Sequence, residues 1–291
     1  MKLTLPRIRE MKLEHHPIVM ITAYDVQAGR LVDEAGVDIV LVGDSAGTNV
    51  LGHSSEVPVT MDEMAMMTRS VTRACKNPFV IADMPFLSYH VSDEEAVRNA
   101  GRLIKEGGAD AVKLEGAGPI AGRVRAVIAG GMPVMGHLGL TPQTATMLGG
   151  MRAQGRGWQQ AVRLYDDALE LEAAGCFGLV LECVPEPVAT AITRRLTIPV
   201  IGIGSGAGTD GQVLVFHDVL GINPDTKRFV RRYAEIGDAT RTGVQAYAAG
   251  VRSGEFPQAE HTYPIAPEEL SAFEAALAHR TAGEHNELAD W

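Results

Sequence analysis

The sequence predicts an α/β fold, a (β/α)8 TIM barrel followed by a C-terminal helical extension. Its 291 residues are somewhat more than the about 250 that such a barrel needs. Eight short runs rich in Val, Ile and Leu recur between longer segments of helical character. Near-continuous apolar runs are typical of parallel strands buried on both faces. Eight of them alternating with helices favour a closed barrel over an open, doubly wound sheet.

The expected strands follow one another in the first three quarters of the chain. The last of them, QVLVFHD, is short and flanked by glycine. Each run has the length and the apolar content that a buried strand requires. We assign strands to residues 18–25, 37–44, 78–85, 110–116, 132–140, 178–185, 198–206 and 212–218.

Helix signals occupy the segments between these runs. Thr60 with Glu63, and Ser92 with Glu95, have the spacing of a capping box, which marks the start of a helix. The glycines of EGGAD at 106–110 end a helix before the next strand. Beyond residue 225 the pattern is helical. We therefore place a single catalytic barrel domain at residues 1–264 and a helical extension at residues 265–291.

Charge and composition exclude several classes of function. The formal net charge of -10 disfavours binding to nucleic acid or to an anionic membrane surface, because both reward clustered Lys and Arg. Cys75, Cys176 and Cys183 form an odd set without CxxC spacing, which argues against a disulfide framework or a zinc site. The N-terminus lacks an apolar signal core, and no run approaches the ~20 apolar residues of a membrane helix. We expect a cytoplasmic protein with no nucleic-acid or membrane partner.

Two connections are too long to be simple turns. Residues 45–59 and residues 141–157 are rich in glycine and polar residues, and each follows the carboxyl end of an expected strand. Long loops in compact domains are usually functional or disordered. On a barrel these two would flank the mouth, where active sites form, and we expect residues 141–157 to form a mobile cover.

Acidic residues gather at the carboxyl ends of the expected strands, which converge on one mouth in a barrel. Converging carboxylates require a divalent cation or shared protons. Oxygen ligands without Cys or several His favour Mg²⁺, and we predict a site at Asp44, Asp83 and Glu115. For any single aspartate, a helix N-cap is the simpler interpretation. The strand-end residues are Asp25, Asp44, Asp83, Glu115, His137 and Glu182.

Three further side chains at the expected mouth carry chemistry. Lys113 lies two residues before Glu115, so both face the same side of a strand; it pairs either with a substrate or with a neighbouring acid. Glu182 ends an apolar strand, which suits a general base. His137 is an acid or base, a hydrogen-bond donor to substrate, or a buried core histidine, and His53 is equally open. The glycine cluster GIGSGAG either cradles a phosphate or only permits a tight turn.

Nine motifs in order make the resemblance to a known family specific. The motifs together closely resemble the ketopantoate hydroxymethyltransferase family, and the match runs in order from about residue 3 to residue 263. Family members are (β/α)8 barrels related to the phosphoenolpyruvate mutase and isocitrate lyase group. The motifs are VGDSAGTNVLGH, VPVTMDEM, ADMPFLSY, VKLEG, GHLGLTPQ, GGMRAQGRG, LECVP, IPVIGIGSGAGTDGQVLVFHD and FPQAEHTY.

The resemblance implies an activity and a set of site residues. The family transfers a hydroxymethyl group from 5,10-methylenetetrahydrofolate to 3-methyl-2-oxobutanoate, giving 2-dehydropantoate for pantothenate and coenzyme A synthesis. Its magnesium ligands correspond to Asp44, Asp83 and Glu115, and its proposed base to Glu182. Its substrate-contacting serine and lysine correspond to Ser45 and Lys113. With the strand-end positions, we expect substrate contacts from Asp44, Ser45, Asp83, Lys113 and His137.

Some features depart from the family or leave alternatives open. Ser205 stands where the family often has alanine, and the residues after about 264 extend beyond the matched motifs. A Mg²⁺-dependent oxo-acid lyase or aldolase of the related barrel group is the first alternative activity, and a noncatalytic metabolite-binding barrel is the second. The resemblance also implies a homo-oligomer, commonly a decamer.

Overall fold

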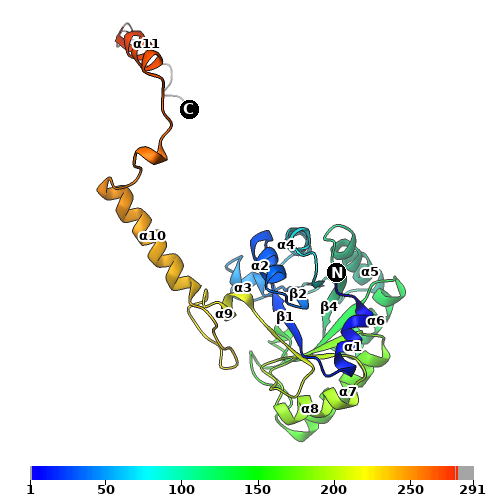
Figure 1. Cartoon of the computed structure of the whole chain (residues 1–291). Coiled ribbons are helices and arrows are strands. Elements are labelled where there is room, and N and C mark those ends of the chain that lie inside the picture. The colour runs from blue at the N-terminus through cyan, green and yellow to red at the C-terminus, as the bar shows by residue number, and fades with distance from the viewer. Residues whose placement is uncertain (1, 279, 281–291) are drawn as a thin grey trace. The chain divides into compact units, whose positions relative to one another are not determined.

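The computed structural model describes residues 2–278 and 280, and its centre is a closed barrel of eight parallel strands paired in sequence order (Figure 1). All eight expected strands are confirmed, each overlapping the run that predicted it. The fold class predicted from the sequence, a (β/α)8 barrel, is therefore correct. The strands are β1 Ile18–Thr22, β2 Ile39–Val42, β3 Phe79–Asp83, β4 Ala111–Glu115, β5 Val134–Gly139, β6 Gly178–Glu182, β7 Val200–Ile203 and β8 Gly211–Leu214.

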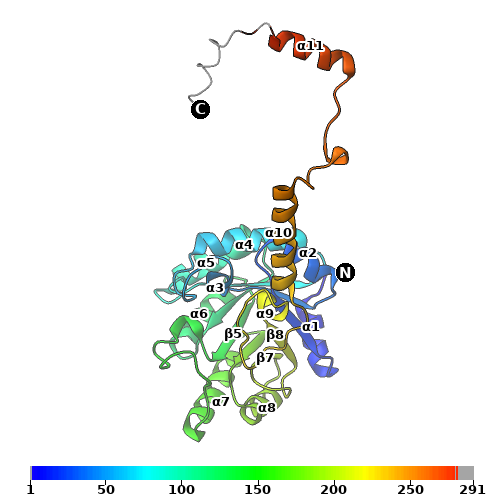
Figure 2. The ribbon, with the colours of Figure 1, turned by 90° about the vertical axis from the view of Figure 1, so that its left-hand side faces the viewer.

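Helices surround the barrel wall (Figures 1 and 2). Thr60 forms the predicted capping box with Glu63 at the start of α4, and Ser92 accepts a hydrogen bond from the Glu95 backbone at the start of α5. No α-helix separates β7 from β8 in the described chain. The helices of this part are α1 Leu5–Leu13, α2 Val26–Glu34, α3 Ala46–Asn49, α4 Met61–Ala74, α5 Asp93–Lys105, α6 Pro119–Ala129, α7 Trp158–Ala173, α8 Glu186–Arg195 and α9 Phe216–Val219, with a 3-10 turn η1 at Pro142–Thr144.

Alternation along each strand divides the apolar side chains between two cores. One set packs between the strands and the surrounding helices. The other fills the barrel interior, where Met20, Leu41 and Ile81 meet Ile8 and Met11 from α1. Because side chains alternate with a period of two, the next inward positions toward the carboxyl ends of β3, β4 and β5 are polar. The strand pattern thus delivers Asp83, Lys113 and His137 to the mouth.

The chain divides into two compact units, Met1–Gly237 and Asp238–Trp291. The second holds most of α10 (Ile236–Ser253), the 3-10 turn η2 (Ala259–His261) and α11 (Pro267–Ala278), and no residue of these helices is buried. The boundary predicted at residues 264 and 265 lies inside this second unit, and the extension from residue 281 onward lies outside the described residues. None of the described helices has the length and apolar character to cross a membrane.

Candidate active site

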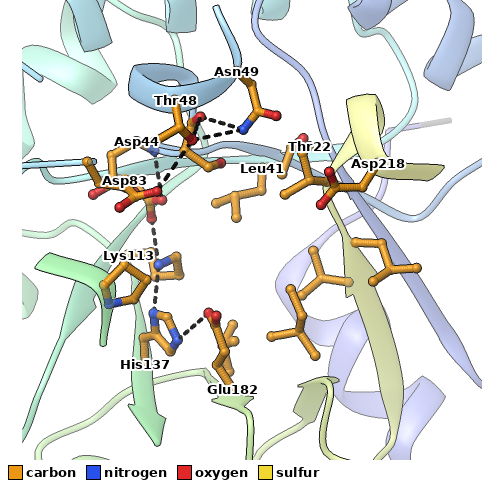
Figure 3. Close-up of a pocket in the computed structure, with 18 of the residues that line it drawn as sticks. Thr22, Leu41, Asp44, Thr48, Asn49, Asp83, Lys113, His137, Glu182 and Asp218 are labelled. Atoms are coloured by element: carbon orange, nitrogen blue, oxygen red, sulfur yellow. Dashed lines mark hydrogen bonds and ion pairs between the residues drawn. The ribbon is translucent and has the colours of Figure 1, made fainter. Parts of the chain in front are cut away.

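A cavity of about 100 Å³ opens at the carboxyl ends of the strands. All seven site residues predicted from the sequence line it, although they come from four strands and one strand-to-helix turn. Figure 3 shows Asp83, Lys113 and His137 along one side of this cavity, with Glu182 pointing into it. The seven are Asp44, Ser45, Asp83, Lys113, Glu115, His137 and Glu182.

Asp44 and Asp83 form the acidic end of the cavity. Asp44 is 4% exposed and Asp83 is 3% exposed, and the Asp44 backbone N–H donates to Asp83 Oδ2 at 3.1 Å. Burial, together with the charge of Asp83, raises the pKa of Asp44 well above its ordinary value. Burial also raises the pKa of Asp83, although Lys113 opposes this. Neither carboxyl is a helix cap, so the simpler interpretation is wrong for this pair.

Lys113 supplies the positive charge nearest to these acids. Its Nζ lies 2.9 Å from Asp83 Oδ1 and 3.9 Å from Glu115 Oε1. Burial alone would lower the pKa of Lys113, but the carboxylates of Asp83, Glu115 and Asp44 outweigh burial and raise it. The lysine is therefore an ammonium ion at neutral pH. The sequence left open whether Lys113 pairs with a neighbouring acid or with a substrate. In the structure it pairs with Asp83 and also lines the cavity.

His137 connects Glu115 to Glu182. Its Nδ1 lies 3.2 Å from Glu115 Oε1 and 3.1 Å from Lys113 Nζ, and its Nε2 lies 3.3 Å from Glu182 Oε2. The Nε2 contact is poorly aligned for a hydrogen bond. Burial would lower the pKa of His137, yet the two carboxylates outweigh burial and raise it. His137 therefore serves to orient two acids rather than to fill the core.

The backbone around Glu182 is fixed on both sides. The Glu182 carbonyl accepts a hydrogen bond from Leu140 N at 2.8 Å, and Gly139 has φ +93 beside it. Cys183 has φ 51, a left-handed conformation that is strained for a residue with a side chain. Ser205 Oγ donates to Leu181 O at 2.8 Å and accepts from Val184 N at 3.1 Å. Glu182 is thus held where it can accept a proton from a bound molecule.

Ser45 is oriented by a chain of hydroxyl groups. Its Oγ lies 2.9 Å from Tyr24 OH, which accepts a hydrogen bond from Thr22 Oγ1 at 2.9 Å. Phe216 N donates to Thr22 Oγ1 at 3.0 Å. Ends of β1 and β2 therefore set the direction of the Ser45 hydroxyl, and neither Thr22 nor Tyr24 was predicted as a site residue.

Gln143 is the most connected residue that the sequence reasoning missed. It is 4% exposed, and its Nε2 donates to Asp44 Oδ2 at 2.8 Å and to Met84 O at 2.9 Å. Its Oε1 accepts from Tyr89 OH at 2.7 Å, and its backbone N–H donates to Glu115 Oε2 at 3.1 Å. Two signals in the sequence marked it: its place in the long loop 141–157 and its position as the last residue of the motif GHLGLTPQ.

The opposite wall of the cavity was also missed. Figure 3 shows Asp218 and Thr22 across the cavity from Asp83 and Lys113. Asp218 is 3% exposed, and its two oxygens accept from Asn223 Nδ2 at 2.6 Å and from Lys227 Nζ at 2.7 Å. Glu56 lines the same cavity, and burial raises its pKa. Lys227 and Asn223 lie outside the expected strands, where no pattern marked them.

Of three further features that the sequence singled out, only Ile203 of GIGSGAG lines the cavity. Asp25 is the N-cap of α2 and accepts from Ala28 N at 2.7 Å, so its place in the acidic ring was wrong. His53 does not line the cavity. The GIGSGAG segment forms the tight connection from β7 to β8, with Gly204 at φ +64 and Gly206 at φ +80. This supports its role as a turn.

The contacts of the cavity acids indicate which of them could bind a metal ion. Within the described residues, no group of three His, Cys, Asp or Glu is arranged to hold an ion. Glu115 is engaged by His137 and by the Gln143 backbone. Asp44 and Asp83 are also engaged, through Gln143 and Lys113, but Asp83 Oδ1 has no well-aligned hydrogen bond. Mg²⁺ is commonly bound through one or two carboxylates with water and substrate oxygens, so this pair fits such an ion. The predicted Mg²⁺ site at Asp44, Asp83 and Glu115 stays a prediction.

Comparison with known proteins decides the family. Residues 2–259 match the family model described as ketopantoate hydroxymethyltransferase. The chain belongs to this family. A 3-methyl-2-oxobutanoate hydroxymethyltransferase of Nitratidesulfovibrio vulgaris (strain DP4) is 51% identical over 96% of this chain and 91% of the relative. The protein of the same name from Moorella thermoacetica is 52% identical over 90% of this chain and 98% of the relative. The protein is therefore an enzyme, a hydroxymethyltransferase, and the noncatalytic alternative is set aside.

Solved structures share the barrel fold. A 2,3-dimethylmalate lyase, described as a member of the PEP mutase/isocitrate lyase superfamily, has a TM-score of 0.57 at 15% identity, covering 95% of this chain and 100% of the other. A phosphoenolpyruvate phosphomutase from Streptomyces platensis subsp. rosaceus has a TM-score of 0.57 at 17% identity, covering 94% of this chain and 97% of the other. At these identities the likeness shows the fold of the transferase alone.

Proposed function

We propose that the enzyme transfers a hydroxymethyl group from 5,10-methylenetetrahydrofolate to 3-methyl-2-oxobutanoate, giving 2-dehydropantoate. The observation that carries the proposal is one small cavity in which a buried ammonium, Lys113, and a buried acid pair, Asp44 and Asp83, face a candidate base, Glu182. To form an enolate, a 2-oxo acid needs a positive charge beside its oxygens and a base beside its C3 proton. The names of the relatives from Nitratidesulfovibrio vulgaris and Moorella thermoacetica supply the substrate.

Each residue has a defined part in this reaction. Glu182 accepts the C3 proton, and His137 steadies its carboxylate from 3.3 Å. The Lys113 ammonium stabilises the negative charge that develops on the 2-oxo oxygen as the enolate forms. The Ser45 hydroxyl, oriented by Tyr24, hydrogen-bonds the substrate carboxylate. The enolate carbon then bonds to the folate-borne methylene carbon as the bond from that carbon to N10 breaks, and N10 takes up the proton held by Glu182. Water replaces N5 at the same carbon and supplies the hydroxyl oxygen, while its second proton goes to N5, leaving tetrahydrofolate.

Mg²⁺ is the cofactor that we propose, with Asp44 and Asp83 as its direct ligands and Glu115 as the third carboxylate. When bound, the ion would hold the oxo acid and acidify its C3 proton. Burial is the main cause that raises the pKa values of Asp44 and Asp83. A bound cation would stabilise the ionised form of both acids, which supports Mg²⁺ at this position. Lys113 itself faces three buried acids, Asp83, Glu115 and Asp44.

The test is proton–deuterium exchange at C3 of 3-methyl-2-oxobutanoate, followed by NMR in D2O without folate. Wild-type enzyme with Mg²⁺ should exchange the proton, and EDTA should suppress the exchange. Glu182→Gln should lose exchange, because an amide cannot accept the proton. The matched control is Glu34→Gln, the same change at an exposed acid on α2.

The exchange experiment separates the proposal from its alternatives. Exchange by Glu182→Gln at the wild-type rate would remove Glu182 from the role of base. Release of a cleaved product from the substrate without folate would instead favour the lyase or aldolase alternative. Formation of 2-dehydropantoate only after addition of 5,10-methylenetetrahydrofolate would support the transferase reaction.

We also propose that the enzyme works as a homo-oligomer, as the family resemblance implies. Large apolar side chains on the helices of the second unit support this, because Val244, Tyr247 and Phe273 are 61%, 64% and 55% exposed. Such exposure is uncommon in a monomer. Light scattering on the full chain would measure the subunit number, and a monomeric mass would contradict the proposal.

A further inference from the structure

A second, larger cavity adjoins the first. It is a groove of about 1120 Å³, and Met151 and Phe229 line both it and the inner cavity. Phe229 is placed by Gly204: a Cβ at that glycine would lie 3.0 Å from the aromatic ring. The ring therefore lies against the end of β7, at the boundary between the two cavities. A molecule that reaches from one cavity to the other passes Phe229 and Met151.

The inner cavity is too small and too acidic for the whole of the folate cosubstrate. At about 100 Å³ it falls below the ~300–1,000 Å³ of typical ligand pockets, and the small oxo acid already requires part of it. Its wall carries six acids against two lysines. The glutamate tail of folate bears carboxylates, which these acids would repel. The acids are Asp44, Glu56, Asp83, Glu115, Glu182 and Asp218.

The groove has the opposite charge. Its basic residues are Arg156 and Arg228, both exposed, and its one acid, Glu186, accepts a hydrogen bond from Ala207 N at 3.2 Å. Neither arginine takes part in an ion pair within residues 2–278. Arginine is the side chain best suited to bind carboxylates, since its guanidinium offers paired donors. On a chain of net charge -10, this is a local cationic site.

We infer that the groove binds the glutamate-bearing tail of the folate cosubstrate, with Arg156 and Arg228 on its carboxylates. The ring system then crosses Phe229 and Met151, which offer an aromatic and a thioether surface for stacking. Its methylene carbon reaches the oxo acid beside Glu182. This inference rests on the proposed function and adds to it the place of the second substrate.

The test compares 5,10-methylenetetrahydrofolate with 5,10-methylenetetrahydropteroate, which lacks the glutamate. In the Arg156→Gln/Arg228→Gln variant, the KM for the folate should rise about ten-fold or more, because charge-assisted bonds are lost. The KM for the pteroate should change less than two-fold. The KM for the oxo acid and the C3 exchange rate without folate should stay at the wild-type values. The matched control is Arg125→Gln, an exposed arginine on α6.

Three outcomes would overturn the inference. An unchanged folate KM in the double variant would place the tail elsewhere. An equal rise in KM for folate and pteroate would mean that the arginines do not recognise the glutamate. Loss of C3 exchange together with a changed mass in light scattering would make the groove a structural contact. Absence of C3 exchange in the wild-type enzyme is distinct from these, because it would refute the proposed function itself.

Discussion

Replacement of Gln143 by leucine tests whether the loop after β5 holds the acids of the active site. Both polar atoms of the Gln143 side chain form hydrogen bonds inside the protein, to Asp44, Met84 and Tyr89. Leucine has a similar size but neither donates nor accepts. The change therefore removes hydrogen bonds without opening a large cavity.

The expected magnitude follows from the groups left behind. Tyr89 OH can still donate to the Glu115 carbonyl at 3.3 Å, but Asp44 Oδ2 and the Met84 carbonyl each lose a donor, and a buried group left unpaired costs ~1–3 kcal/mol. Two such groups at ~2 kcal/mol give ~4 kcal/mol, and the added apolar burial of leucine returns ~1 kcal/mol. The free energy of unfolding should fall by ~3 kcal/mol. The hydrogen bond from Gln143 also opposes the raised pKa of Asp44, so its loss favours the protonated acid.

Urea unfolding followed by circular dichroism measures the stability, and C3 exchange measures the site. Gln154→Leu is the matched control, because Gln154 lies in the same loop and its side chain donates only to the Arg152 carbonyl. Gln143→Leu should lose both stability and exchange, whereas the control should stay within ~0.5 kcal/mol of the wild type. Equal values for the two variants would refute the view that Gln143 positions Asp44.

Three further predictions concern the fold around the site. Thr60→Ala removes the hydroxyl that accepts from the Glu63 N–H at the start of α4, and the free energy of unfolding should fall by ~1 kcal/mol. The Thr60 backbone and then its hydroxyl lower the pKa of Glu63, so the carboxylate's share of the stability is present above the usual carboxyl range and is lost as pH falls through the lowered pKa. The difference in urea midpoint between the variant and the wild type should therefore shrink in acid. Gly139→Ala should give insoluble or strongly destabilised protein, since its Cβ would lie 2.2 Å from Glu182 O at φ +93; a wild-type melting temperature would contradict this. Glu115 and Glu182 outweigh burial and raise the pKa of His137, so its protonated form adds stability that is complete below pH 6.5 and is lost as pH rises through the raised pKa. The melting temperature of the wild type, measured in EDTA, should fall over this range, and that of His137→Asn should fall less.

The sequence by itself determined the barrel and one side of its mouth. A strand made of a continuous apolar run must be buried on both faces, and a parallel strand in a barrel surrounded by helices is buried in this way. Once the strands were known, the period of two and the convergence of strand ends placed Asp83, Lys113 and Glu182 together. These positions depend on local pattern and on the symmetry of the barrel, both of which are visible in one dimension.

The tertiary structure decided what no local pattern could carry. Asp218 lines the cavity, and Gln143 and Tyr24 hold the cavity residues Asp44 and Ser45, because loops and helix starts fold back over the barrel mouth. Their hydrogen bonds join residues up to 99 positions apart. Asp25 has the same strand-end position as the acids that line the cavity, yet its side chain turns to cap α2. Which way such a side chain turns depends on the competition between a free backbone N–H and the cavity. That competition is settled by the packing of neighbouring elements, and the sequence alone does not contain it.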